Sequence, residues 1–290
     1  MWIFIQSLIN GLLAGGVYAL IGVGITIVFG VMKIVNFAAG AYLVWGMYFT
    51  YLWYQVTGLN AYLLIPLVAM TMIIFGFATF KLTIKPVLNT GGTAFILVTV
   101  GLSFLLQNLI EVFFDPTPRT VPSSIKLSSL QIGSFSIGLP RLIAFAAMLV
   151  LVLFVNLLLN KTLFGRAMKA TSESSVIARM LGINTDRTYT IAFIIGITFA
   201  GLAGLLITPL YYVTATSGKI FSTVPLMAVV LGGLGNIKGA LIGGLLVGVV
   251  EAVVGSQLSP DLGPVGITLL FLVVVYLKPK GLFGKGERTA

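Results

Sequence analysis

A stripe of polar side chains runs along one otherwise apolar segment of the sequence. Its members stand four residues apart: Thr99, Ser103, Gln107 and Glu111. On a helix this spacing places them on one face over about 18 Å, at roughly 1.5 Å per residue. Such groups hydrogen-bond either to a solute on its path or to neighbouring helices, and the spacing leaves both interpretations open.

Polar groups also stand in three other apolar segments. Gln6 and Asn10 belong to the first segment, Asn36 opens the second, and Glu251 lies near the end of the eighth. Because polar groups inside a membrane are costly, they often mark function. We therefore predict a solute pathway lined by Gln6, Asn10, Asn36, Thr99, Ser103, Gln107 and Glu111. Glu251 and Glu111 are the only acids in these segments, and they face either bulk water or the ammonium group of an amino acid.

The sequence lacks the residues and motifs of common enzymes. It has no cysteine and no histidine, which removes thiolate chemistry, the commonest general base and the usual zinc ligands. No GxxxxGK[ST], GxSxG or HExxH motif occurs. We therefore predict a protein that is not an enzyme, has no cofactor or metal, and leaves any nucleotide hydrolysis to a separate subunit.

Long apolar segments must position these groups. Hydrophobic residues make up 58% of the chain, charged residues 8%, and the mean hydropathy is +1.11. A soluble domain carries about 25% charged residues, and about 20 apolar residues cross a bilayer as a helix. We predict an all-α, polytopic membrane bundle of eight or nine helices in a single domain, residues 1–290. The segments are 3–31, 35–53, 61–80, 93–114, 142–159, 189–210, 221–234, 240–254 and 265–277, the seventh short enough for a half-helix.

Basic residues predict the orientation of this bundle. With nine crossings and an external N-terminus, 13 of the 17 lysines and arginines are cytoplasmic. The four external ones are Arg119, Lys126, Arg141 and Lys219. Cytoplasmic loops are enriched in such residues, so we predict an external N-terminus and a cytoplasmic C-terminus. The net charge of +10 then reflects this topology and not contact with nucleic acid.

Two loops and three stripes of small residues complete the pattern. Residues 115–141, rich in proline, predict an external and partly strand-like loop. Residues 160–188 predict a cytoplasmic loop with an amphipathic helix, capped by Ser172 with Ser175 and ended by Gly182. Small residues spaced by four predict close packing of helices in lipid. These are Gly11, Gly15 and Ala19; Gly196, Ala200 and Gly204; and Ala240, Gly244, Gly248 and Ala252.

Several of these segments resemble a known family. Residues 165–173 (GRAMKATSE) and 178–184 (ARMLGIN) resemble the loop of ABC importer permeases that docks on the ATPase. Residues 24–38 (GITIVFGVMKIVNFA), 232–236 (GGLGN) and 277–284 (LKPKGLFG) resemble the permeases of branched-chain amino acid importers. The resemblance covers nearly the whole chain. It implies that the following residues couple to the ATPase: Gly165, Arg166, Ala170, Glu173, Ala178 and Gly182. A plain interfacial helix is the alternative for this loop.

The resemblance also implies partners and a substrate class. The partners are a second permease, identical or different, two cytoplasmic ATPases, an external substrate-binding protein and the lipid of a bacterial inner membrane. The substrate is a branched-chain or other neutral amino acid. Ala39 and Ala41 stand where the family usually has histidine and an acid, which keeps urea or short amides open. A secondary transporter or a channel for small neutral solutes is the alternative outside this class.

Overall fold

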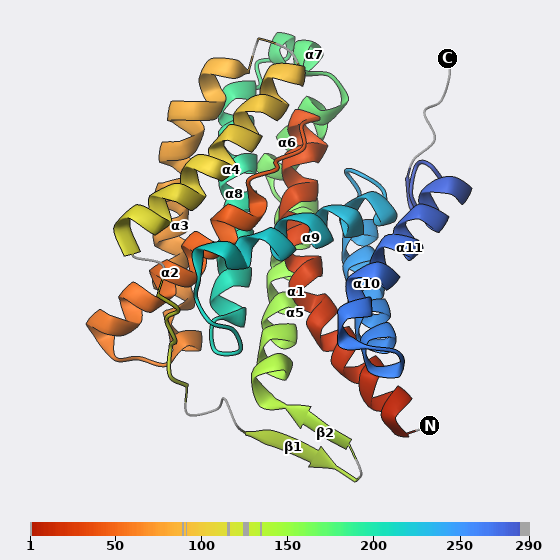
Figure 1. Cartoon of the computed structure of the whole chain (residues 1–290). Coiled ribbons are helices and arrows are strands. Elements are labelled where there is room, and N and C mark those ends of the chain that lie inside the picture. Colours follow the sequence, from red (N-terminus) through yellow and green to blue (C-terminus); the bar gives the residue numbers. More distant parts are fainter. Residues whose placement is uncertain are drawn as a thin grey trace.

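The longest helix, α1 (Trp2–Met32), runs through the middle of the molecule (Figure 1). Its 31 residues extend about 46 Å at 1.5 Å per residue, more than the roughly 30 Å of a hydrocarbon core, so the helix is long enough to cross a bilayer with a tilt. The computed structural model describes residues 2–88, 90, 92–114, 117–123, 128–133 and 135–284. Lys126, Lys285 and Arg288, which enter the predicted charge distribution, lie outside the described residues.

Helices and one β-hairpin account for the rest of the described fold. The helices are α2 (Ala39–Thr57), α3 (Ile65–Thr79), α4 (Gly92–Phe114), α5 (Leu139–Lys161), α6 (Leu163–Glu173), α7 (Ser175–Met180), α8 (Thr185–Ile207), α9 (Gly218–Gly232), α10 (Ile237–Gln257) and α11 (Gly263–Leu277). Helical turns on both sides of α3 extend it to Ala61–Val87. The antiparallel strands β1 (Ser129–Ile132) and β2 (Phe135–Gly138) form the hairpin, which agrees with the strand-like character predicted for this loop.

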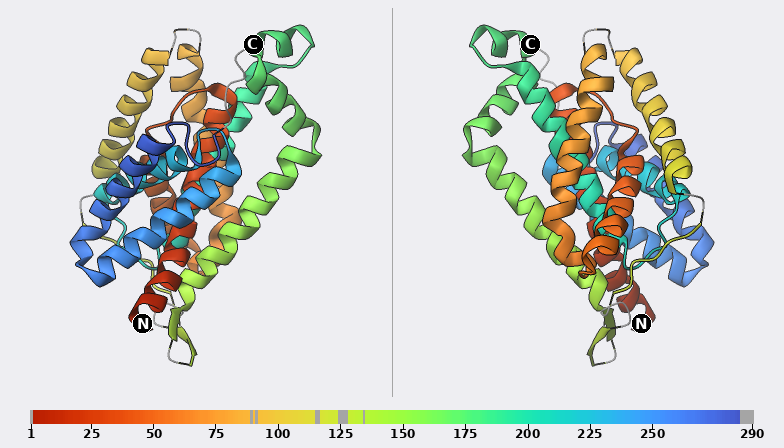
Figure 2. Two further views of the ribbon diagram at one scale, coloured as in Figure 1. Left: turned by 90° about the vertical axis from the view of Figure 1, so that its right-hand side faces the viewer. Right: turned by 90° about the vertical axis from the view of Figure 1, so that its left-hand side faces the viewer.

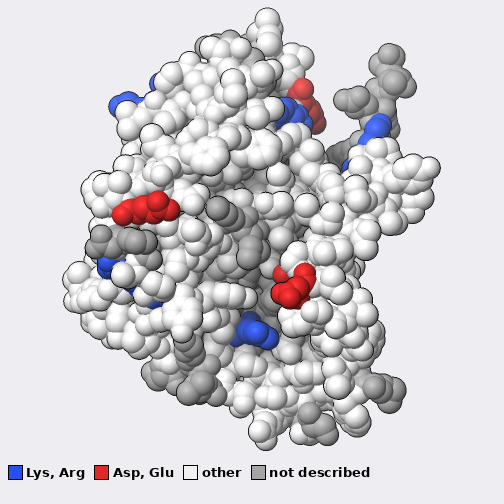
Figure 3. Space-filling view, in the orientation of Figure 1, with Lys and Arg blue, Asp and Glu red and all other residues white. Residues whose placement is uncertain are grey.

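Eight helices of the described chain are long and apolar enough to cross a membrane. The predicted all-α membrane bundle is therefore confirmed, and Figure 3 shows how few charged side chains interrupt the face seen there. The second of the nine predicted segments, which contains α2, is not among these eight helices. The 19 residues of α2 include four tyrosines and two tryptophans, which lower its mean hydropathy.

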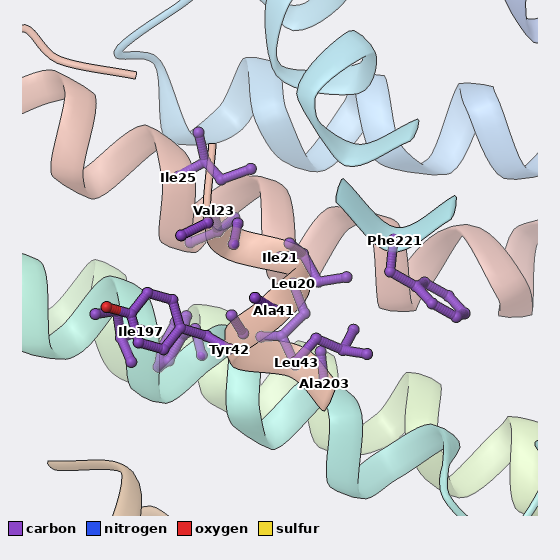
Figure 4. Close-up of a cluster of buried hydrophobic side chains, with 14 of the residues drawn as sticks. Leu20, Ile21, Val23, Ile25, Ala41, Tyr42, Leu43, Ile197, Ala203 and Phe221 are labelled. Atoms are coloured by element: carbon purple, nitrogen blue, oxygen red, sulfur yellow. The ribbon is translucent and has the colours of Figure 1, made fainter. Parts of the chain in front are cut away.

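A buried core surrounds α1 and α8. In the most apolar window of each span, 83% of the α1 residues and 78% of the α8 residues are buried, against 17% for Pro260–Leu277, which contains α11. Leu20 and Ile21 of α1, Tyr42 and Leu43 of α2, and Ile197 of α8 meet in this core (Figure 4). The peripheral helices expose apolar side chains, as expected for contact with lipid.

Glycines allow the central helices to approach closely. A β-carbon at Gly15 of α1 would lie 2.8 Å from the carbonyl oxygen of Gly244 in α10. One at Gly24 of α1 would lie 2.6 Å from the carbonyl oxygen of Gly196 in α8. Ordinary contacts between such atoms are near 3.5–4.0 Å, so larger residues do not fit there. The close packing predicted from the stripes of small residues is confirmed.

Two helices begin inside the bundle. After α1 the chain turns at Lys33, whose φ is +57°, and residues 33–38 return into the core as irregular, non-helical backbone (Figure 1). The second segment therefore becomes helical at Ala39, four residues later than predicted. A β-carbon at Gly40 of α2 would clash with Ser222 and Gly218 of α9, so the first turns of α2 and α9 lie side by side.

The bundle has two distinct ends, which we name the hairpin end and the α7 end (Figures 1 and 2). Trp2 of α1 stacks on Phe135 of the hairpin, with ring centroids 5.2 Å apart, so α1 begins at the hairpin end. Helices α6 and α7 and the connection from α3 to α4 lie at the opposite end. Helix α5 leads from the hairpin to α6 at the α7 end, and α8 leads back from α7 into the bundle.

We expect Gly15→Ala to destabilise the fold, because the added methyl group meets α10 and overpacking costs about 1–3 kcal/mol. Gly101→Ala is the matched control, since nothing lies within 4 Å of a β-carbon added at Gly101 of α4. Thermal unfolding in detergent should give a lower Tm for the first variant and an unchanged or slightly higher Tm for the second. Equal Tm values would contradict the importance of this contact.

Candidate functional site

A pocket of about 410 Å³ opens where α4 faces the first turns of α2 and α9. Its size falls within the roughly 300–1,000 Å³ of typical small-molecule sites. Apolar side chains and four polar ones line it together, and none of the described lining residues is charged. The lining residues are Phe37, Ala41, Val44, Val100, Ser103, Phe104, Gln107, Ile110, Ala215, Gly218, Ser222 and Thr223.

The predicted polar stripe of α4 reaches this pocket at two of its four positions. Ser103 and Gln107 line the pocket, whereas Thr99 is 1% exposed and donates a hydrogen bond to the carbonyl oxygen of Ile96, 3.2 Å away. Glu111 is exposed and does not belong to the lining. The stripe on α4 therefore has three different surroundings: the buried core at one end, the pocket in the middle and the exposed surface at the other end.

The other predicted pathway residues lie elsewhere. The Gln6 amide nitrogen donates a hydrogen bond to the carbonyl oxygen of Ser136 at 2.6 Å, and its oxygen accepts one from the Ser136 backbone at 3.2 Å. Gln6 thus attaches the hairpin to α1. Asn36 is buried and accepts a hydrogen bond from the Ala38 backbone at 3.0 Å, while Asn10 is half-buried on α1.

Sequence reasoning missed the contribution of α9 to the pocket. Ser222 and Thr223 are the polar lining residues outside α4. They stand side by side at the start of the seventh apolar segment, and a search for polar residues at the beginnings of short spans identifies them. Their position depends on α9 beginning inside the bundle, which hydropathy does not reveal.

Two short helices protrude at the α7 end (Figure 2). The loop predicted to hold one helix has two, because Ser174 interrupts the helix with an extended backbone and caps α7 by accepting a hydrogen bond from the Ile177 backbone at 3.3 Å. The expected caps Ser172 and Ser175 lie within helices instead. Gly182 follows α7 with φ of +82°, a left-handed conformation that favours glycine.

The six residues predicted to couple to the ATPase differ in burial. Gly165 and Ala178 are buried; a β-carbon at Gly165 would clash with the backbone of Leu159. Arg166, Glu173 and Gly182 are exposed, and Ala170 is half-buried.

Helix α7 presents an apolar surface. Ile177 is 58% exposed and Met180 80% exposed, and both continue into a larger exposed set: Leu163, Val176, Ile177, Met180 and Leu181. A hollow of about 530 Å³ lies beside this surface and is lined by Lys85, Arg179, Thr185, Asp186 and neighbouring residues. Exposed apolar side chains next to a polar hollow are typical of a site that binds another protein.

Eight candidate membrane spans around a pocket between helices are the architecture of a multi-pass membrane protein. A family model described as "Branched-chain amino acid transport system / permease component" matches residues 7–276. The chain belongs to this family of transport components.

Similar proteins match over almost their full length. The chain is 31% identical to the high-affinity branched-chain amino acid transport system permease protein LivH of Salmonella typhimurium, over 98% of this chain and 96% of LivH. It is 28% identical to BraD of Pseudomonas aeruginosa, with the same description, over 98% of this chain and 97% of BraD. It is 25% identical to LivM of Salmonella typhimurium, over 92% of this chain and 67% of LivM.

The natural absence of cysteine allows a direct test of the pocket. We expect Ser103→Cys and Gln107→Cys in native membranes to react with a charged, water-soluble thiol reagent, because the thiolate that reacts needs water. Leu105→Cys should stay unreactive, since its side chain is 54% exposed without lining the pocket and we expect it to face lipid. The measurement is the extent of labelling by mass spectrometry. Equal labelling at all three positions, or labelling at Leu105→Cys alone, would count against a wet pocket.

Proposed function

We propose that this chain is one membrane subunit of an ATP-driven importer and carries the path of a branched-chain or other neutral amino acid. The observation that carries this proposal is the uncharged pocket between α2, α4 and α9. Ser103 and Gln107 supply hydrogen bonds to the polar part of the solute, while Val44, Val100 and Phe104 offer apolar contact to its side chain. An ion would need charged ligands or a ring of carbonyl groups, and a lining of neutral polar and apolar side chains suits an ion poorly.

The proposed orientation places the hairpin end outside and the α7 end in the cytoplasm. Along the chain, helix ends at the α7 end carry most of the described basic residues, including Lys81, Lys85, Lys161 and Lys169. Arg119 and Arg141 stand near the hairpin end. Cytoplasmic enrichment of lysine and arginine supports this orientation. Nine crossings are supported if residues 33–57 cross as an irregular segment (33–38) followed by α2, because irregular backbone is tolerated inside a membrane where protein buries it.

The proposed partners follow from the surface at each end. Of the two cytoplasmic ATPases of the importer, one binds the α7 surface of this chain. Gly165, Ala178 and Gly182 shape this surface, and Arg166, Ala170 and Glu173 fix the register of the contact. A substrate-binding protein meets the hairpin end. A second permease pairs with this one within the inner membrane. Salmonella typhimurium has two relatives of this chain, LivH and LivM, which favours a different partner over an identical one.

The assembled importer tests the function directly. We expect the chain, purified with its partners and placed in vesicles with its binding protein, to accumulate labelled leucine only with ATP. Excess isoleucine should compete, and excess urea or acetamide should not. Competition by urea or acetamide, without competition by isoleucine, would indicate that the substrate is urea or a short amide. Accumulation by this chain without any ATPase would contradict the importer and favour a channel or secondary transporter.

The α7 surface yields a second expectation. We expect Met180→Asp and Ile177→Asp to abolish ATP-driven uptake and the co-purification of the ATPases, because apolar anchors of an interface carry much of its binding energy. Both side chains are exposed in this chain, so its Tm should not change. Met180→Leu keeps the apolar contact and should retain uptake. Full uptake by the aspartate variants would contradict ATPase binding at α7 and would identify α7 as a plain helix on the membrane surface.

A further inference from the structure

The segment between α4 and the hairpin contains one residue that contacts three other parts of the bundle. Residues 117–123 run beside α2 on their way from α4 to the hairpin (Figure 1). The half-buried Arg119 of this segment exchanges two backbone hydrogen bonds with Val213, at 3.1 and 2.8 Å. Its guanidinium donates a hydrogen bond to the carbonyl oxygen of Phe114 at 2.5 Å and lies 5.0 Å from the ring centre of Tyr51.

The three residues that Arg119 contacts belong to the three walls of the large pocket. Tyr51 is part of α2, and Phe114 is the last residue of α4. Val213 is fully buried, stands two residues before the pocket-lining Ala215, and leads into α9. Arg119 therefore joins the elements whose side chains line the pocket, although it does not line the pocket itself.

These contacts all lie on the side of the pocket that faces the hairpin end. Along α4 the lining residues reach as far as Ile110, and Phe114 stands about one turn further toward the hairpin end. Along α2 they reach Val44, and Tyr51 stands about two turns further on. A solute that passes between the hairpin end and the pocket must move past these contacts.

The contacts of the guanidinium hold the walls in place without a buried ion pair among the described residues. The Arg119 Nε is buried and has no hydrogen-bond partner there, so the group rests on the Phe114 carbonyl oxygen and on the rings of Tyr51 and Phe114. A guanidinium stacks well on aromatic faces, and separating such a stack costs less than breaking a buried ion pair. This arrangement can therefore both position the walls and release them.

We propose that Arg119 is a positioning residue that clasps the pocket on the side of the hairpin end, and that the solute passes this side only when the clasp opens. The backbone bridge to Val213 fixes the approach to α9, and the guanidinium holds α2 and α4 against it. The proposal rests on the proposed function and adds the gate that faces the binding protein. Docking of that protein supplies the force that separates these contacts, while the glycine-packed core around α1 and α8 stays in place.

A disulfide tests whether the clasp must open, because the natural chain has no cysteine. Arg119 and Val213 oppose each other in an antiparallel bridge, where α-carbons of a hydrogen-bonded pair lie about 5.5 Å apart, within the range of a disulfide. We expect the double variant Arg119→Cys with Val213→Cys, oxidised by copper phenanthroline in the assembled importer, to lose nearly all ATP-driven uptake of labelled leucine. Dithiothreitol should restore the uptake, and mass spectrometry measures the crosslink.

Matched variants separate the clasp from a general effect of oxidation or crosslinking. Leu130→Cys with Ile137→Cys joins opposite residues of β1 and β2, and its oxidation should leave uptake unchanged because the two strands already form one hairpin. The single variant Val213→Cys should not respond to oxidation. Full uptake through a crosslinked clasp would overturn this inference. Failure of the two cysteines at 119 and 213 to crosslink would overturn it as well, because their pairing would be absent.

A labelling experiment that needs no transport tests the clasp by itself. A charged thiol reagent that does not cross membranes is applied outside intact cells to Gln107→Cys, with its thiol in the pocket. We expect an added Arg119→Ala to make this labelling several times faster, and an added Arg119→Lys, which keeps a cation beside Tyr51, to have a smaller effect. Leu105→Cys should label equally slowly with and without Arg119→Ala, which excludes a general loosening of the bundle.

The two readouts distinguish a failure of this inference from a failure of the proposed function. An equal labelling rate of Gln107→Cys with and without Arg119→Ala would overturn the clasp and leave the importer intact. A natural importer that accumulates no leucine would overturn the proposed function, and the labelling rates would then still decide whether Arg119 closes the pocket.

Discussion

In lipid, two apolar helices gain little by hiding their side chains from water, so their association depends on contact at short range. Glycine provides that contact here. Gly15 and Gly24 on α1 bring it against α10 and α8, and Gly46 on α2 meets the backbone of Gly201 on α8. Each contact joins backbone to backbone, which fixes the angle and register of the helices more firmly than flexible side chains do. The central position of α1 and α8 follows from these contacts.

This close packing makes room for irregular backbone inside the bundle. Residues 33–38 enter the core as irregular backbone, and Asn36 accepts a hydrogen bond from the backbone of Ala38, the residue that precedes α2. Without such partners, unpaired backbone groups in hydrocarbon cost several kcal/mol. Helices α2 and α9 can therefore begin within the bundle, and the 410 Å³ pocket lies where their first turns meet α4. The pocket therefore exists because two helices begin inside the bundle and do not cross it completely.

The sequence predicts what depends on periodicity and misses what depends on contacts between distant residues. Long apolar runs locate the helices, and spacing by four identifies Gly11, Gly15 and Gly248 as packing positions. The same spacing groups Thr99 with Ser103 and Gln107, although only the latter two reach the pocket. The contact of Gln6 with Ser136 spans 130 residues, and no local pattern announces it. The start of α2 at Ala39 is hidden as well, because hydropathy is equally high in extended and helical backbone.

Helix α8 connects the two sites of the proposed importer. It begins beside Arg179, which donates a hydrogen bond to Thr185 at 3.0 Å, and it ends just before Ala215 and Gly218 of the pocket. Between these points it packs closely against α1 and α2 through contacts between glycine backbones. A tightly packed interior transmits a displacement instead of absorbing it locally, so α8 is the element through which the α7 surface and the pocket of the proposed importer are joined. The first turns of α2 and α9 lie at the other end of this connection, where Ala41 and Ser222 line the pocket.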